Sequence, residues 1–453
     1  MNSLQTIVAP ATPPGVSAIA IVRLSGTDSI EIVQKVFKGK NLTEQLSHSI
    51  HFGKIVKDNQ VIDEVMVSVF REPSSFTKEN SVEISCHGSP LIVGKIIQVL
   101  IDSGARMASP GEFTKRAFLN KRFDLTQAEA VAGLIHAENE VAHKAAMHQM
   151  RGGFKKELEM LRQELIHFAS LVELELDFGE EDVEFVKRDE LKNMVLRIQS
   201  IIQPLIESFR IGNVVKNGIR TVIAGKPNSG KSTLLNALLN EERSIVSEIP
   251  GTTRDVIEDV IHMDGIAIRF IDTAGLRDAR DPIESIGINK THQEIQRASL
   301  VLYLIDLSET SVEEIGLQES KLKEFGIPYL LVGNKVDRAD KPMISQLTAS
   351  GCILISALEK KNLQTLKNRI TTLFKTGIAT QDGTLITNWR HYENLEETNH
   401  ALHRVIQGLD TRLSGDFIAL DIRQALFYLG LITGEISTED LLESIFSKFC
   451  IGK

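Results

Sequence analysis

The sequence predicts a multidomain protein with an N-terminal α+β domain, an all-α helical domain, and an α/β domain inserted into the helical one. Proline is absent between Pro110 and Pro204 and again after Pro342, so these stretches can form long helices. Between the two helical arms, residues 219–375 alternate short apolar runs with helical patterns, which is typical of a mostly parallel sheet wrapped by helices. We therefore expect the N-terminal domain at residues 1–119, the helical domain at 120–215 and 379–453, and the inserted domain at 216–378.

The N-terminal domain contains both the alternating pattern of strands and the spacing typical of helices. The runs IAIVRLSG, VMVSVF and VEISCHG alternate as strands do, while TDSIEIVQKVF and LIVGKIIQVLIDSG have the spacing of helices. The helical arms follow. Residues 126–177 repeat near the helical period, with Thr126 and Glu129 as a capping box and Gly152-Gly153 as a break, and residues 389–449 read similarly. The inserted domain supplies five further strand candidates, TVIAG, IAIRFID, LVLYLID, YLLVGN and CILISA.

Composition limits the classes of partner. The 453 residues carry 51 Lys and Arg against 60 Asp and Glu, so the net charge of -9 repels nucleic acids and anionic membranes, and any RNA contact needs a local basic patch. The three cysteines have no metal-binding or redox spacing, which fits a reducing compartment. The sequence shows neither the pattern of a secretory signal nor an apolar run long enough for a membrane span. We expect a cytoplasmic protein with no membrane partner.

A phosphate-binding loop follows the predicted strand TVIA. Residues 225–232 read GKPNSGKS and match G-x-x-x-x-G-K-[ST], with the helical STLLNALLN behind them. In such a loop, backbone N–H groups surround the phosphates, Lys231 reaches the β- and γ-oxygens, and Ser232 offers its hydroxyl to Mg²⁺.

Three further motifs predict GTP as the nucleotide. Asp272–Gly275 follows a predicted strand and suits a carboxylate near Mg²⁺. Asn334–Asp337 follows another, and a carboxylate there accepts hydrogen bonds from the ring N–H and amine of guanine, a pair that adenine lacks. Ser356-Ala357 completes the base pocket. Ras-like enzymes orient the attacking water with a Gln, but Leu276 follows Gly275 here, so catalysis must be assembled differently.

With SEIPGTTRD as the effector loop, these motifs resemble the translation-factor-related GTPases. Four segments carry the resemblance further, to the MnmE (TrmE) family of tRNA uridine-modification GTPases: TIVAPATPPG with IAIVRLSG, PGEFTKRAFLNKRFDLTQAEAV, DTAGLR with ESIGI, and the final CIGK. The likeness spans nearly the whole chain.

That resemblance implies a homodimer in which the N-terminal domain binds folate and the GTPase domain is activated by potassium. It also implies a heterotetramer or larger assembly with MnmG, an FAD-containing partner, that adds a (carboxymethyl)aminomethyl group at carbon 5 of the wobble uridine of certain tRNAs. The one-carbon donor would be 5-formyltetrahydrofolate or a related tetrahydrofolate. The sequence leaves open which tRNAs are substrates and what supplies the amine.

The resemblance also assigns residues. The K⁺ ligands fall on Asn228, Ser247, Ile249 and Thr252, the Mg²⁺ hydroxyls on Ser232 and Thr253, and the water-orienting carboxylate on Glu284. The folate contacts fall on Arg23, Glu83, Arg122 and Lys453, and Cys450 is a candidate nucleophile. The GTP contacts fall on Asn228, Ser229, Gly230, Lys231, Ser232, Thr233, Ser247, Glu248, Ile249, Pro250, Gly251, Thr252, Thr253, Asp272, Thr273, Ala274, Gly275, Asn334, Lys335, Asp337, Ser356 and Ala357.

Simpler interpretations remain beside these assignments. Glu284 lies in a charged stretch and equally reads as a solvated side chain. Arg23 and Glu83 lie in predicted strands and equally read as side chains that pair with neighbours on a sheet face. Lys115, Arg116, Lys121 and Arg122 equally read as a solvated helix face, and Cys450 as a small buried hydrophobe. A metal site at His87, His136, His143 and His148 is disfavoured because no carboxylate or Cys pattern accompanies them.

One alternative function is an Era-like GTPase switch in ribosome assembly. Those relatives carry an RNA-binding domain after the GTPase module, whereas this chain has an α+β domain before it, so the N-terminal domain discriminates between the two hypotheses.

Overall fold

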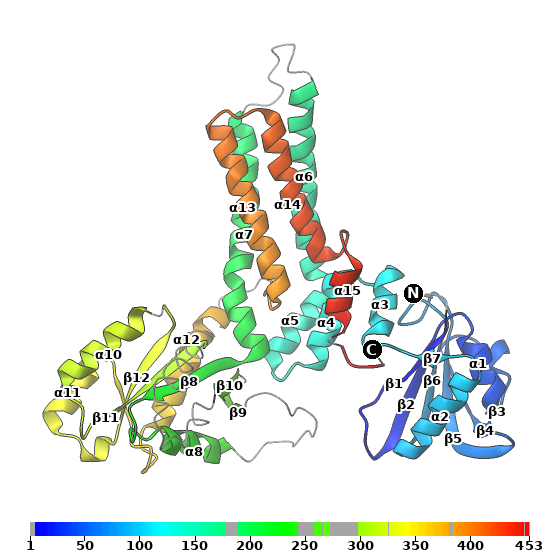
Figure 1. Ribbon diagram of the computed structural model, residues 1–453, viewed down its shortest axis with the longest axis horizontal. Coiled ribbons are helices and arrows are strands. Elements are labelled where there is room, and N and C mark those ends of the chain that lie inside the picture. Colours follow the sequence, from blue (N-terminus) through cyan, green and yellow to red (C-terminus); the bar gives the residue numbers. More distant parts are fainter. Residues whose placement is uncertain are drawn as a thin grey trace, which may run out of the picture. The chain divides into compact units, whose positions relative to one another are not determined.

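The computed structural model describes residues 5–177, 188–242, 258–263, 266–271, 298–324, 326–379, 384–447 and 449–452. It divides into two compact units. The first comprises Met1–Ile135, Met147–Ile198 and Glu397–Lys453, and the second comprises His136–Ala146 and Gln199–Glu396. The predicted fold class is confirmed: a mixed sheet domain, a set of long helices and an inserted α/β domain (Figure 1).

The N-terminal part of the first unit is a seven-stranded sheet with helices on one face. Its order is β3-β4-β5-β6-β2-β1-β7. Helices α1 (Ser29–Val36) and α2 (Pro90–Asp102) pack on β6 and on each other, and a 3₁₀ turn spans Leu42–Glu44. The strands are β1 (Ile7–Pro10), β2 (Ser17–Ser25), β3 (Phe37–Lys38), β4 (Ser49–Lys57), β5 (Gln60–Phe70), β6 (Ser81–Gly88) and β7 (Arg106–Met107).

The two faces of this sheet differ in burial because successive strand residues point to opposite sides. One face builds a core with α1 and α2 that includes Val22, Val67 and Ile84. On the other face, apolar side chains of β2, β4 and β5 stay between 43% and 63% exposed; these are Ile19, Ile50, Phe52 and Met66, with Phe52 directly opposite Met66 in the ladder. The sheet therefore presents an exposed apolar face, which we call the open face.

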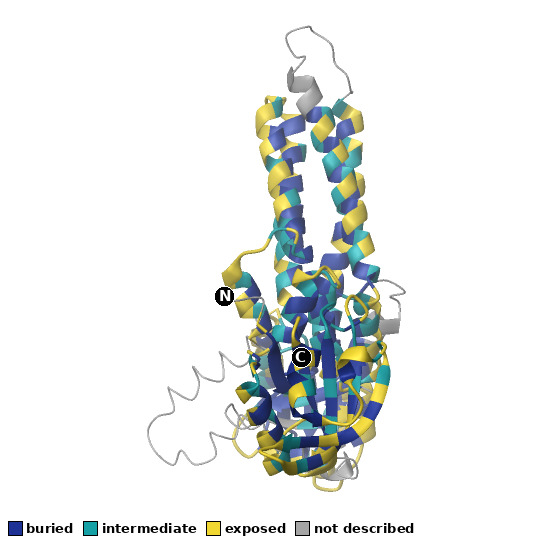
Figure 2. Cartoon of the chain, turned by 90° about the vertical axis from the view of Figure 1, so that its right-hand side faces the viewer, coloured by how far each residue is buried: buried dark blue, intermediate teal, exposed yellow. Residues whose placement is uncertain are grey.

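The predicted helical arms are helical throughout most of their length. The first holds α4 (Leu125–Ile135), α5 (Glu140–Met150) and α6 (Gly153–Asp177), and the second holds α13 (Trp389–Asp410), α14 (Gly415–Thr433) and α15 (Glu439–Phe446). α3 (Glu112–Leu119) precedes them. Within the first unit α6 packs along α14, and buried positions follow one stripe of these helices (Figure 2). Gly152, with a φ of 83°, separates α5 from α6 as predicted.

One detail of the helical prediction was wrong. The start of α4 is capped by Asp124, whose Oδ1 accepts from the backbone N–H of Gln127 at 2.8 Å, while Gln127 Oε1 accepts from the backbone N–H of Asp124. The capping box is therefore Asp124 and Gln127, two residues before the predicted pair, and Thr126 lies inside the helix. Pro204 lies within α7 (Arg188–Asn217) and does not end it.

The inserted domain is a six-stranded sheet of order β13-β12-β11-β8-β10-β9. All five predicted runs form strands: β8 (Ile219–Gly225), β10 (Ile266–Ile271), β11 (Leu300–Asp306), β12 (Tyr329–Asn334) and β13 (Ile353–Leu354). They pair in parallel, and the unpredicted β9 (Glu258–Met263) pairs antiparallel with β10. The helices are α8 (Lys231–Glu242), α10 (Val312–Glu324), α11 (Lys341–Ala349) and α12 (Leu363–Ala379), and Val336–Arg338 forms a 3₁₀ turn.

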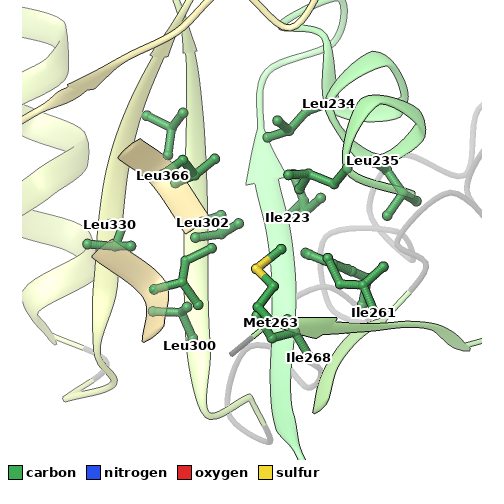
Figure 3. Close-up of a cluster of buried hydrophobic side chains, with 14 of the residues drawn as sticks. Ile223, Leu234, Leu235, Ile261, Met263, Ile268, Leu300, Leu302, Leu330 and Leu366 are labelled. Carbon is green, nitrogen blue, oxygen red and sulfur yellow. The ribbon is translucent and has the colours of Figure 1, made fainter. Parts of the chain in front are cut away.

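An aliphatic core fixes the strand ends that carry the motifs. Ile223 of β8, Leu302 of β11 and Leu235 of α8 lie in one buried cluster (Figure 3). The helix behind the phosphate loop therefore packs directly on the sheet. Because the carboxyl ends of parallel strands meet at one edge, the loops after β8, β11 and β12 come together there. Among the described residues, no helix has both the length and the apolar character that a membrane crossing requires.

Candidate functional site

The phosphate loop requires glycine at two positions. Gly225 ends β8 with a φ of 145°, and a Cβ there would lie 2.3 Å from the carbonyl oxygen of Leu304. Gly230 precedes α8 with a φ of 97°, and a Cβ there would lie 2.3 Å from Nδ2 of Asn334. Both contacts are closer than any side chain tolerates. The loop can therefore pack against β11 and β12 only with glycine at these places.

Lys231 begins α8 and turns back over the loop. Its Nζ donates to the carbonyl oxygens of Gly225 and Lys226, each at 2.8 Å. Burial lowers the pKa of the Lys231 ammonium below its ordinary value, because a desolvated cation is disfavoured. The ammonium thus lies at the N-terminus of α8, where both the helix and the lysine favour the binding of a phosphate anion.

Asn334 joins the phosphate loop to the base motifs. It is buried at the end of β12. Its Nδ2 donates to the carbonyl oxygen of Ser229 at 2.9 Å, and its Oδ1 accepts from the backbone N–H of Ala357 at 2.9 Å. The Asn334 side chain therefore connects three predicted motifs: its own, the phosphate loop and Ser356-Ala357.

The predicted base residues Asn334, Lys335, Asp337 and Ser356 line one pocket, and Ala357 is not among its lining residues. Asp337 stands in the 3₁₀ turn after β12, and a hydrogen bond from Ser356 holds the pKa of its carboxyl below the usual value. The carboxylate is ionised at neutral pH and can accept from paired N–H donors. The pocket is lined by Gly230, Thr233, Asn334, Lys335, Asp337, Arg338, Ser356 and Leu358.

Asp306 is a residue of this region that the sequence reasoning missed. It ends β11 directly opposite Asn334 in the parallel ladder, and its carboxylate forms an ion pair with Nζ of Lys335. Burial alone raises the pKa of the Asp306 carboxyl, but hydrogen bonds from Lys335 and Ser308 outweigh it and leave the pKa below the usual value. Lys335 itself has a left-handed backbone with a φ of 64°, which is uncommon for residues other than glycine. The sequence feature that could have identified Asp306 is its position as the last residue of the strand LVLYLID, because the motifs also follow the ends of parallel strands.

The remaining nucleotide residues divide into two groups. Asn228, Ser232 and Thr233 are exposed on the loop and the first turn of α8. The predicted Ser247, Glu248, Ile249, Pro250, Gly251, Thr252 and Thr253, the Asp272, Thr273, Ala274 and Gly275 motif, and Glu284 lie outside the described residues.

In the N-terminal domain, Arg23 and Glu83 lie on the open face. They are direct neighbours in the β2–β6 ladder, and Nε and Nη2 of Arg23 both contact Oε1 of Glu83, at 2.9 and 2.8 Å. The guanidinium carbon of Arg23 lies 5.7 Å from the ring centre of Phe76. The two predicted residues therefore form a cross-strand ion pair beside an aromatic ring. Both contacts use Oε1 of Glu83, and Oε2 makes no contact with Arg23 among those described.

Arg122 approaches the same ring. Its guanidinium carbon lies 5.5 Å from the ring centre of Phe76, and its Nη1 donates to the carbonyl oxygen of Ser75. The structure thus brings Arg23, Glu83 and Arg122 together. The solvated-face interpretation is wrong for Arg116, which is buried and paired with Glu79 and Glu112.

The C-terminal tail docks on this region. The carbonyl oxygen of Gly452 accepts from Nη1 of Arg23 at 3.3 Å, and the backbone N–H of Gly111 donates to the carbonyl oxygen of Cys450 at 3.4 Å. A Cβ at Gly452 would lie 2.1 Å from the carbonyl oxygen of Pro10, so only glycine allows this approach. Lys453 lies outside the described residues. Cys450 is exposed, so its interpretation as a small buried hydrophobe is wrong.

The histidines form no metal site with other ligands in the part of the chain that the structure describes. His87 instead pairs through Nδ1 with Oδ1 of Asp63 at 2.8 Å.

Comparison with known proteins decides the family. A model described as the GTP-binding protein TrmE N-terminus matches residues 6–122, and a model of the MnmE helical domain matches residues 125–450. A tRNA modification GTPase MnmE from Cytophaga hutchinsonii is 53% identical over 453 residues, which covers 100% of this chain and 98% of the relative. The chain belongs to the MnmE family.

A second relative agrees with MnmE membership. The MnmE protein of Christiangramia forsetii is 50% identical and both chains are covered in full. Among solved structures, Era from Aquifex aeolicus bound to GDP and aluminium fluoride is 26% identical over 40% of this chain and 66% of that chain, with a TM-score of 0.27. A TM-score that low carries no argument about function. The residues matched by the MnmE helical model include those of the inserted sheet.

Proposed function

We propose that this protein hydrolyses GTP and uses the reaction in the modification of tRNA. The observation that carries the proposal is the bridge made by Asn334, which connects the phosphate loop at Ser229 to the base pocket at Ala357. A nucleotide in this site would meet Lys231 at its phosphates and the ionised Asp337 at its base. The N-terminal and helical family matches favour this function over an Era-like switch.

Guanine specificity has a direct test at Asp337. Xanthine presents a carbonyl where guanine has its amine, so Asp337→Asn should weaken GTP binding and favour xanthosine triphosphate. Fluorescent-nucleotide titration measures both affinities. Unchanged GTP affinity in this variant would contradict the base-pocket assignment.

Two cations belong to the proposed mechanism. Ser232 and Thr253 would hold Mg²⁺, and Asn228 with Ser247, Ile249 and Thr252 would hold K⁺. The exposed hydroxyl of Ser232 at the start of α8 and the exposed amide of Asn228 fit hard cations, which prefer oxygen ligands. When bound, these cations neutralise charge that develops on the phosphates. Hydrolysis should then be much faster in K⁺ than in Na⁺ at equal ionic strength, and equal rates with saturating GTP would exclude the potassium site.

Glu284 is the proposed water-orienting residue because the carboxylate that has this role in the MnmE family falls on it, and Leu276 stands where Ras-like enzymes have Gln. A residue that orients water acts on the transition state, so Glu284→Ala should depress kcat and leave GTP affinity nearly intact. Single-turnover hydrolysis beside nucleotide titration separates this role from that of a solvated glutamate, which would alter neither.

The second proposed site binds a one-carbon tetrahydrofolate, 5-formyltetrahydrofolate or a relative, at Arg23, Glu83, Arg122 and Lys453. Oε2 of Glu83 is available to accept from the donor edge of a pterin, and Arg122 suits the folate carboxylates. The docking of Gly452 on Arg23 supports a role for the adjoining Lys453.

This site is tested with two variants. Glu83→Ala should remove the pterin acceptor at a cost of about 1–3 kcal/mol, and deletion of Ile451 to Lys453 should weaken folate without altering GTP hydrolysis. Calorimetric titration with 5-formyltetrahydrofolate measures both. Full affinity in each variant would place the folate elsewhere.

The modification itself is proposed to need partners. We infer a homodimer that covers the part of the open face formed by β4 and β5, because exposed Ile50, Phe52 and Met66 are apolar side chains of the kind that interfaces bury. With the FAD-containing MnmG, in a heterotetramer or larger, the protein would install the (carboxymethyl)aminomethyl group at carbon 5 of the wobble uridine, in the cytoplasm. Cys450 is the candidate nucleophile because its thiol is exposed on the docked tail. Cys450→Ser should then abolish modification and spare folate affinity.

A further inference from the structure

Two lysines of the N-terminal domain have an unusual backbone. Lys78 has a φ of 58° and Lys121 a φ of 56°, both in the left-handed region that glycine and asparagine adopt more readily. Nζ of Lys78 donates to the carbonyl oxygen of Lys121 at 3.0 Å, so these two loop positions lie together. A lysine in each place costs backbone strain that glycine would avoid and asparagine would reduce. This favours a use for their side chains.

The lysines adjoin the proposed folate site. Nδ2 of Asn120 donates to the carbonyl oxygen of Thr77 at 2.7 Å, and Arg122 donates to Ser75, so residues 75–78 and 120–122 are joined along their length. Arg122 lies against Phe76, whose ring also lies beside Arg23. Contacts therefore lead from Glu83 through Arg23, Phe76 and Arg122 to the two lysines.

The positive charge of this end of the site is not neutralised by neighbouring carboxylates. Among the described residues, the ion pairs of the region join Arg116 to Glu79 and to Glu112, and Arg106 to Glu112. Lys78, Lys121 and Arg122 take part in no such pair there. Three cations thus gather at one end of the site in a chain with a net charge of -9. Such a local patch attracts anions.

We propose that Lys78 and Lys121 bind the γ-linked glutamate chain of a polyglutamylated tetrahydrofolate. The inference rests on the proposed folate site and extends it. With the pterin at Glu83 and the first carboxylates at Arg122, each further γ-linked glutamate adds one carboxylate beyond Arg122, where the lysines stand. Lysine suits this task because its ammonium is a mobile point charge that follows carboxylates of variable position. The phosphates of an RNA share the anionic chemistry, but the contacts with the folate residues favour the glutamate chain.

The test compares two ligands on the full-length protein. Calorimetry would measure the affinity of 5-formyltetrahydrofolate with one glutamate and with five. The wild-type chain should bind the pentaglutamate about tenfold more tightly at low salt, and the preference should shrink as salt screens the charges. The double variant Lys78→Asn, Lys121→Asn should lose most of this preference. Asparagine accepts the left-handed backbone, so the substitution removes charge with little added strain. Lys40→Asn, an exposed lysine after the distant edge strand β3, is the matched control and should keep the preference.

Each outcome decides between the proposals. Equal affinity of the wild type for both ligands, or a preference that survives in the double variant, would overturn the role of the lysines and leave the folate site standing. Failure of the wild type to bind either ligand would overturn the folate site as well. If the double variant instead lost affinity for an anticodon stem-loop RNA while the two folates bound equally, the patch would belong to RNA.

Discussion

At the residue scale, Lys231 couples nucleotide binding to pH. Burial lowers the pKa of its ammonium in the free protein, and bound phosphates would raise that pKa, so binding requires the protonated form. The affinity for GTP should therefore fall as pH rises through the lowered pKa, at a lower pH than an ordinary lysine would give. Titrations between about pH 7 and pH 10 measure this. Lys231→Arg should remove the part of the dependence that the ammonium causes, because arginine stays charged. An affinity that is flat over this range in the wild type would contradict the role of Lys231.

Asp306 acts at the same scale through Lys335. The ion pair holds the side chain of Lys335, which lines the base pocket. Asp306→Asn keeps the shape and removes the charge, and GDP affinity should fall about tenfold. Glu313→Gln, an exposed carboxylate on α10, is the control and should leave GDP affinity unchanged. If Asp306→Asn lowered thermal stability without weakening GDP, Asp306 would be a structural residue only.

At the element scale, the loop before α8 is built by close contact. Gly230→Ala would place a methyl group against Nδ2 of Asn334 and break its hydrogen bond to Ser229. With the strained φ, this should cost about 1–3 kcal/mol of stability and more than about tenfold in nucleotide affinity. The matched change is Gly316→Ala inside α10, where a Cβ meets nothing within 4 Å and should stabilise the protein by about 0.5–1 kcal/mol. Urea unfolding and nucleotide titration compare the two, and equal effects would contradict the contact argument.

The elements that the sequence did not predict have physical reasons. β4 carries exposed Ile50 and Phe52 on the open face beside buried residues on the other face, so its polarity does not alternate. β9 begins with two acidic residues, and β3 and β7 are two residues long. The cap of α4 was misplaced because both Asp124 and Thr126 can cap a helix, and only the backbone decides which one does.

At the scale of the whole molecule, the described motifs follow β8, β12 and β13, whose parallel pairing brings their carboxyl ends to one sheet edge. Asp306 was missed because it belongs to no motif, and its partner Lys335 is brought to it by strand pairing between β11 and β12. The docking of the tail on Arg23 depends on contacts across 429 residues of sequence, which local patterns do not encode. The family resemblance supplied that expectation.

The central claim is that this chain is a GTP-dependent enzyme of tRNA modification, and mass spectrometry of wobble uridines tests it most directly. Cells that lack the protein should accumulate wobble uridines without the (carboxymethyl)aminomethyl group in certain tRNAs. The wild-type chain should restore the group, and Asp337→Asn should fail to do so at ordinary GTP levels. Wobble uridines that keep their full modification in cells without the protein would contradict the account.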